Sequence, residues 1–155
     1  MNERKLPPRA KIVEALSTVV DERIIIEDLL SKEWKCISSS TPWKFYKILY
    51  NEKENQIISN DSWSTNQWFI WYPAIAFLLK IWKLKYDKSI LEMVKDTDWI
   101  KIKWLVNKDY ESSYRLILWN LHMQWFNVDH FVTQIENIYN QISELHLKPL
   151  MVENT

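Results

Sequence analysis

The chain contains no glycine among its 155 residues. A usual frequency of about 7% would give roughly eleven. P-loops, the G-x-G-x-x-G turn of dinucleotide-binding folds and the G-x-S-x-G elbow of α/β-hydrolases all need glycine, because their backbone adopts positive φ or approaches a ligand closely. The sequence therefore excludes these three sites. Eleven asparagines are present, and we expect them to take left-handed turn positions. An AT-rich genome would explain the same composition.

Cysteine is almost absent as well. Cys36 is alone, so no disulfide and no Cys-based zinc or iron–sulfur site can form within the chain. The three histidines lie on two predicted helices with no carboxylate at ligand spacing, so we expect no metal site.

Long hydrophobic runs are missing too. The most apolar stretch, 68–79, has twelve uncharged residues, whereas a membrane-spanning helix needs roughly 20. No signal peptide is visible after Met1. These features predict a cytoplasmic protein without a membrane partner.

The hydrophobic pattern predicts a mainly α (α+β) fold, in which a helical bundle core carries a small antiparallel β meander in the N-terminal half. The meander covers 23–60 and includes a hairpin with a five-residue loop at 51–55. The other segments are predicted helices: 8–20, a buried central helix over 73–84, short helices after Asp87 and Asp98, 109–126, and a last one that opens at Asn127, stays in register through Leu145 and is closed by Pro149. We expect one domain, 1–155, with disordered ends at about 1–5 and 150–155.

Lysines gather in one segment although the formal net charge is zero. Residues 80–108 hold eight lysines and four acids, and they also include Trp82, Trp99 and Trp104. Because positive charge attracts phosphates and aromatic faces stack on unpaired bases, this mixture is typical of single-strand binding. Lysines on the solvent face of amphipathic helices would produce the same pattern.

Ten tryptophans are far more than usual. We expect five of them to pack in the core: Trp34, Trp43, Trp82, Trp119 and Trp125. Another three, Trp63, Trp68 and Trp71, cluster around the polar segment 59–68 before the central helix. Exposed rings among amides and hydroxyls favour a ligand-binding lip. The alternative is a capped helix entry with buried rings.

The predicted helix over 109–126 is apolar on two faces. The second face consists of Leu116, Trp119, Met123 and Phe126. Such a helix is either sandwiched within its own fold or docked on another chain. These four residues are therefore the candidate partner interface.

No catalytic constellation is apparent in the sequence. Neither Cys36 nor any serine has a recognisable base and orienting group. Phosphoryl transfer needs several carboxylates for magnesium, and we interpret Asp96 and Asp98 as helix caps. We therefore predict that the chain is not an enzyme.

Several segments follow one another in a recognisable order. Leu6-Pro7-Pro8 opens the first predicted helix, and Ala74–Leu79, Tyr86–Val94, Asp96–Asp98 and Asp109–Arg115 come later. This order resembles the C-terminal domain of the large subunit of archaeal and eukaryotic primases. There, a Pro-Pro start, an A-x-F-L helix, an E-E-I helix and a T-R-Y-Q helix occur in turn.

The sequence differs from that primase domain in two respects. That primase domain carries a four-cysteine iron–sulfur cluster, which a single cysteine cannot bind, so no cofactor is expected. Its arginine before the A-x-F-L helix falls on Trp71. A free-standing domain without a cluster resembles the PriX-type non-catalytic third subunits of crenarchaeal primases. Such a subunit would dock on the catalytic and large primase subunits and help to bind single-stranded DNA or the initiating nucleoside triphosphate.

The resemblance also implies a set of binding residues by position. Six would face the nucleotide and two lysines would meet phosphates: Asn60, Asp61, Trp63, Gln67, Trp68, Trp71, Lys80 and Lys83. An accessory primase subunit is the first hypothesis. The second is a generic protein-interaction or dimerisation module with no nucleic-acid role. A nucleotide-using enzyme is the third.

Overall fold

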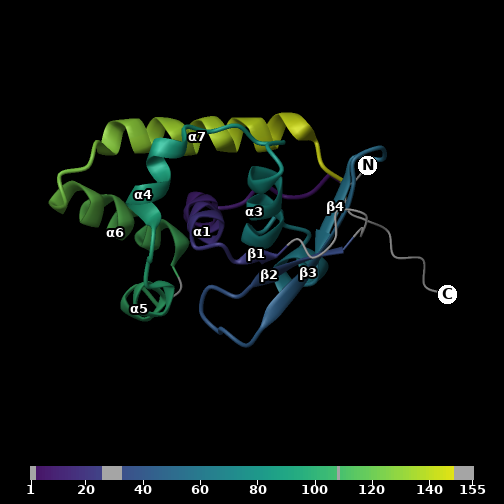
Figure 1. Ribbon diagram of the computed structural model, residues 1–155, viewed down its shortest axis with the longest axis horizontal. Coiled ribbons are helices and arrows are strands. Elements are labelled where there is room, and N and C mark those ends of the chain that lie inside the picture. The colour runs from purple at the N-terminus through teal and green to yellow at the C-terminus, as the bar shows by residue number, and fades with distance from the viewer. Residues whose placement is uncertain (1–2, 26–32, 108, 149–155) are drawn as a thin grey trace.

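A four-stranded antiparallel sheet and a group of helices share one hydrophobic core in the computed structural model (Figure 1). The structure describes residues 3–25, 33–107 and 109–148. The sheet lies in the N-terminal half, so the predicted α+β class is confirmed. The elements in chain order are α1 (Arg9–Val20), β1 (Ile24–Ile25), β2 (Glu33–Ile37), β3 (Phe45–Asn51), β4 (Gln56–Ser59), α2 (Ser62–Asn66), α3 (Tyr72–Lys80), the 3-10 turn η1 (Lys88–Ile90), α4 (Leu91–Val94), α5 (Trp99–Leu105), α6 (Tyr110–Met123) and α7 (Val128–Leu145).

Helix α3 is the centre of the molecule, as predicted. Its residues 72–79 are all buried, because it packs against α1 and against the sheet (Figure 1). Phe77 meets the sheet through Trp34 and Tyr50, with ring centroids 4.4 Å and 5.6 Å away. Pro73 occupies the first turn, where its missing N–H costs nothing.

The strands follow the order β1-β2-β3-β4, and each pairs with the next in antiparallel fashion. Inward-facing positions supply the sheet's share of the core: Ile24, Cys36, Ile48 and Ile57. Asn51 pairs with Gln56, so the hairpin loop has four residues, 52–55, rather than the predicted five. Part of the predicted meander, 26–32, lies outside the described residues.

Polar caps begin the later helices where the sequence predicts them. Asp87, Asp98, Asp109 and Asn127 each accept a hydrogen bond from a backbone N–H in the first turn that follows. Helix α7 then buries four residues at helical spacing: Phe131, Ile135, Ile138 and Ile142. It lies along the helical side of the molecule, where it also contacts α1 (Figure 1).

Two helices end earlier than predicted, and both end before a tryptophan. Helix α3 stops at Lys80 because Trp82 adopts φ 63°, and Lys83 N donates to Leu78 O at 3.0 Å. Helix α6 stops at Met123, with Trp125 at φ 66°. Both are left-handed helix ends of the kind that glycine usually forms.

Eight described residues have positive φ in total: Glu22, Asn55, Trp68, Trp82, Asp96, Asn107, Trp125 and His146. Only two are asparagines, so the expectation that asparagine replaces glycine is right for a minority of these positions.

The core expectation for tryptophan is wrong for four of five residues. Trp34 packs on Phe77, but Trp43 is 84% exposed and Trp125 is 95% exposed. Trp82 and Trp119 are exposed as well. Trp82 and Trp125 lie just after the ends of α3 and α6, and Trp43 lies in the loop between β2 and β3. At such positions the spacing of apolar residues does not predict burial.

The ends of the described chain are tied to the fold. Arg4 N donates to Leu147 O at 2.9 Å, and Ile70 N donates to Lys5 O at 2.9 Å. Arg4 is buried, and its Nε donates to Ile57 O at 3.1 Å. Residues 4 and 5, which the sequence places in a disordered end, are thus hydrogen-bonded to the rest of the fold. Residues 150–155 lie outside the described part of the chain.

Candidate functional site

A cavity of about 580 Å³, here called the pocket, opens between the helices and strand β3. Cavities of this size hold small-molecule ligands. Its walls come from α1, the start of β3, α2, the start of α3, α5 and the start of α6. Three lysines and seven aromatic residues line it: Lys11, Lys44, Lys103, Phe45, Tyr46, Trp63, Trp71, Tyr72, Trp99 and Tyr110.

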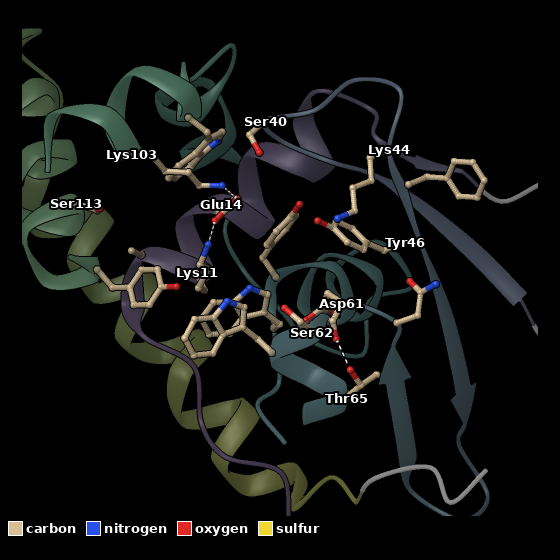
Figure 2. Close-up of a pocket in the computed structure, with 18 of the residues that line it drawn as sticks. Lys11, Glu14, Ser40, Lys44, Tyr46, Asp61, Ser62, Thr65, Lys103 and Ser113 are labelled. Carbon is tan, nitrogen blue, oxygen red and sulfur yellow. Dashed lines mark hydrogen bonds and ion pairs between the residues drawn. The ribbon is translucent and has the colours of Figure 1, made fainter. Parts of the chain in front are cut away.

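One wall of the pocket holds a buried carboxylate between two amines (Figure 2). Glu14 is 1% exposed, and its oxygens lie 2.5 Å from Lys11 Nζ and 3.5 Å from Lys103 Nζ. The Ser39 hydroxyl donates to the same carboxylate. Because one negative charge faces two positive charges, this cluster carries a net positive charge and attracts anions.

Burial and ion pairing oppose each other in this cluster. Burial alone raises the pKa of the Glu14 carboxyl, but Lys11 and Lys103 hold that pKa below its ordinary value. Desolvation lowers the pKa of the Lys11 ammonium. The attraction of Glu14 offsets this lowering only in part, and like-charge repulsion from Lys103 adds to it. The carboxylate is therefore kept ionised by its two neighbours.

An aromatic wall adjoins this cluster. Trp63 stacks on Trp71, with ring centroids 5.0 Å apart and planes 19° apart. Tyr110 meets both rings edge-on. Lys11 Nζ lies 4.9 Å from the Trp71 centroid and 5.3 Å and 5.1 Å from those of Tyr72 and Tyr110. The wall is thus a fixed, flat apolar surface beside cationic groups.

Helix α2 places Trp63 at this wall. Asp61 caps α2, since its Oδ1 accepts from Ser64 N at 2.8 Å, and its Oδ2 accepts from the hydroxyls of Ser59 and Ser64. Asp61 also attracts the buried Arg4 guanidinium, whose pKa is lowered by desolvation and partly restored by this carboxylate. The Asp61 carboxylate is therefore engaged within the fold.

The opposite rim of the pocket is exposed and polar. Lys44, just before β3, lies across the cavity from Lys103 (Figure 2). Its Nζ is 5.3 Å from the Tyr46 ring centroid. Hydroxyl and amide side chains continue the rim: Asn60, Ser62, Thr65 and Asn66. This rim offers one cation and several hydrogen-bonding groups to a ligand.

The pocket brings together four of the eight predicted binding residues: Asn60, Asp61, Trp63 and Trp71. Trp71 is only 3% exposed, so its ring is buried rather than one of the exposed rings that the sequence predicts for a ligand-binding lip. Trp63 and Trp68 are partly exposed. Asp61 caps α2. The segment therefore combines exposed rings, as expected of a ligand-binding lip, with a capped helix entry and one buried ring.

The other four predicted residues lie outside the pocket lining: Gln67, Trp68, Lys80 and Lys83. Tyr72 at the start of α3 lines the pocket, whereas Lys80 is the last residue of the same helix. Lys80 follows Tyr72 by eight positions, which is a rise of about 12 Å along the helix. Lys83 pairs instead with Glu52 at 3.3 Å.

Sequence reasoning misses the ionic centre of the pocket. Lys11 and Glu14 lie within the first helix, whose residues 10–18 are all buried. Two opposite charges three residues apart among buried positions are a signal that could have been found, because lone buried charges are rare. Lys44, Lys103 and Tyr110 join them only through the tertiary fold.

The second stripe of α6 divides into two parts. Trp119 and Met123 are exposed, whereas Leu116 and Phe126 are half-buried and pack against the core. The helix is therefore sandwiched along half of this stripe and open to solvent along the other half.

Among the described residues, no group of three or more His, Cys, Asp or Glu side chains could hold a metal ion. No helix in the same residues is long and apolar enough to cross a membrane. The two carboxylates of the pocket, Glu14 and Asp61, already accept hydrogen bonds or ion pairs from the protein. The arrangement is suited to binding a flat anionic ligand.

The family of the chain follows from a comparison with known proteins. Residues 4–148 match the family described as Uncharacterised conserved protein UCP014422, so the chain belongs to that family. No curated protein and no solved structure matches the chain.

Proposed function

We propose that the protein is a non-catalytic accessory subunit of an archaeal-type primase, acting in the cytoplasm, and that it binds the initiating nucleoside triphosphate in the pocket. One observation carries the proposal. The stacked Trp63 and Trp71 rings share a single cavity with the amines of Lys44 and Lys103. A nucleotide needs both an aromatic surface for its base and cations for its phosphates.

The geometry suggests how the ligand lies. The base stacks on the Trp63 ring of the aromatic wall. Because Trp71 and Tyr110 already hold this ring in place, it loses little freedom on binding. The phosphates lie between Lys44 and Lys103, which flank the cavity (Figure 2). Asn60 Oδ1 already accepts from Lys47 N, and the Thr65 hydroxyl donates to Asp61 O, so the Asn60 amide N–H groups and the Thr65 hydroxyl oxygen as acceptor are left for the sugar or the base edge.

A binding role rather than a catalytic one agrees with the state of the pocket carboxylates. Two-metal phosphoryl transfer uses carboxylates that are open to bind magnesium. Here Glu14 is shared by Lys11 and Lys103, and Asp61 caps α2. In a primase complex, the catalytic subunit would supply the chemistry and this chain would present the nucleotide.

Calorimetric titration of the full chain with ATP tests the pocket. Lys44→Glu puts a negative charge beside the phosphates, so we expect affinity to fall by about tenfold or more. The matched control is Lys80→Glu/Lys83→Glu, which changes exposed lysines outside the pocket lining and should leave ATP affinity unchanged. Equal affinities for the Lys44→Glu variant and the wild type would contradict the proposal.

A second function is favoured by the open half of the α6 stripe. Trp119 and Met123 are large apolar side chains that the described residues leave exposed, and such residues are typical of protein interfaces. We assign this surface to docking on the catalytic and large primase subunits. Met123→Glu should abolish co-purification with those subunits while ATP binding persists. Undiminished co-purification would reject this interface.

A further inference from the structure

A second aromatic and cationic surface lies away from the pocket, where the chain leaves α3. Trp82 is 45% exposed and stacks on Tyr86, with ring centroids 5.2 Å apart and planes 8° apart. Lys88 Nζ lies 4.8 Å from the centre of the Trp82 ring. None of these residues lines the pocket. We call them, together with Lys80 and Lys85, the Trp82 platform.

Trp82 has a backbone conformation that is unfavourable for a residue with a large side chain. Its φ of 63° places a large side chain in the left-handed region, where glycine or asparagine is preferred. Trp68 and Trp125 share this conformation, so the backbone alone does not mark a binding site. At Trp82 it results in an indole that is stacked on one neighbour and still half exposed.

The platform is held in place by α7. Gln141 accepts from Lys85 N at 2.8 Å and donates to Lys85 O at 2.7 Å, and Gln134 accepts from Asp87 N at 2.8 Å. The connection after α3 therefore runs along α7 in a fixed path (Figure 1). A surface ordered before binding loses less entropy when a ligand arrives.

The charges of this surface are mostly positive. Lys80, Lys85 and Lys88 make no ion pair among the described residues, while Lys83 pairs with the exposed Glu52. The one acid of the connection, Asp87, caps η1 and lies 3.1 Å from His130. Lys88, which lies over the Trp82 ring, and Lys80 and Lys85, which are within three positions of Trp82 in the sequence, therefore remain available to an anionic ligand.

From this geometry we infer that the Trp82 platform binds single-stranded nucleic acid, independently of the pocket. A base stacks on Trp82 in place of the Lys88 ammonium, since base stacking is worth more than an exposed cation–π contact. The displaced ammonium, with Lys80 and Lys85, then meets the phosphates on either side of that base. The Trp82 ring lies open on the surface rather than in the pocket, which suits a continuing strand rather than a single nucleotide.

Fluorescence polarisation with a labelled oligodeoxythymidine of about 16 nucleotides tests the inference on the full chain. Trp82→Asn removes the ring but keeps a residue that tolerates the left-handed backbone. We expect it to weaken binding by about tenfold. The matched control is Trp125→Asn, which removes an exposed tryptophan with the same backbone conformation after α6 and should bind like the wild type.

The lysines give a separate readout. Lys80→Gln/Lys88→Gln should reduce the slope of log affinity against log salt by about 0.7 for each lysine removed. An unchanged slope, equal weakening by Trp82→Asn and Trp125→Asn, or no oligonucleotide binding by the wild type would overturn the inference. ATP titration of the same variants separates the two sites, since ATP affinity belongs to the pocket and should not change.

Discussion

At the scale of single residues, the most unusual feature is the use of tryptophan where other proteins use glycine. Trp68, Trp82 and Trp125 all have positive φ. A residue with a Cβ in this region costs about 1 kcal/mol or more relative to glycine. Since Trp125 is 95% exposed, its ring does not recover that cost through burial within the chain.

Glycine at Trp125 should therefore stabilise the protein. Phe126 N donates to Leu121 O at 3.1 Å, which is the hydrogen bond of a left-handed helix end. We expect Trp125→Gly to raise the free energy of unfolding by about 0.5–1 kcal/mol in urea titrations. Trp119→Gly, in the interior of α6, should lower it by about 1 kcal/mol. The same sign for both variants would contradict this interpretation.

The buried carboxylate of the pocket makes a second prediction. In Glu14→Gln, the buried Lys11 ammonium loses its partner, so we expect a loss of about 3 kcal/mol in unfolding free energy. The double variant Glu14→Gln/Lys11→Met removes the unpaired charge and should recover much of this loss. A double variant that is less stable than Glu14→Gln would show that the ion pair is not the cause.

Acid sensitivity should come partly from the same group. The folded protein holds the pKa of Glu14 below its ordinary value, so between the folded and unfolded pKa values only the unfolded state binds a proton. The contribution of Glu14 is complete above a pH of about 4.3 and is lost as pH falls through the lower folded pKa. Urea titrations from neutral to acid pH should show a shallower decline for Glu14→Gln than for the wild type.

At the scale of elements, the short helix α2 positions one side of the pocket. Its cap, Asp61, is buried and accepts three hydrogen bonds, two of them from hydroxyl groups. Removal of the Asp61 carboxylate leaves the buried donors of Ser59 and Ser64 without an acceptor, because water does not easily reach them. The element that carries Trp63 therefore depends on one carboxylate.

Asp61→Ala should destabilise the protein by about 2 kcal/mol or more, because cap and network are lost together. Asp109→Ala at the exposed cap of α6 should cost about 1 kcal/mol, since water can satisfy the N–H groups there. Comparing the two unfolding midpoints checks the prediction. It fails if Asp61→Ala is the milder change.

Helix starts are predictable here because each depends on a local pattern. Asp87, Asp98, Asp109 and Asn127 stand directly before a helical run, and a cap needs only its own first turn. Helix ends and tryptophan burial are harder to predict. The fate of Trp43 or Trp125 depends on which side of a turn faces the core, and that is decided by the packing of distant elements.

At the scale of the whole molecule, α3 separates two surfaces with similar chemistry. Its first residue, Tyr72, lines the pocket, and its last, Lys80, belongs to the Trp82 platform. From the sequence, lysines and tryptophans of both surfaces, such as Lys80 and Trp63, are placed in a single nucleotide-binding site. The fold divides them, because a nine-residue helix stands between the segments.

The pocket itself was only partly predictable for the same reason. Trp63 and Asn60 lie in one polar segment that can be recognised locally, and they do line the cavity. Glu14, Lys44 and Lys103 come from three distant parts of the chain. Only the packing of α1 against α3 and α6 brings the charges to the aromatic wall.

The most direct test of the central claim is a titration of tryptophan fluorescence with ATP. Trp63 lines the pocket and is partly exposed, so a stacked base should quench it, and the apparent affinity should fall as salt rises. Trp63→Leu should lose most of the quenching, while Trp125→Gly should keep it. Quenching that survives in Trp63→Leu, or no change with ATP at low salt, would contradict a nucleotide site in the pocket.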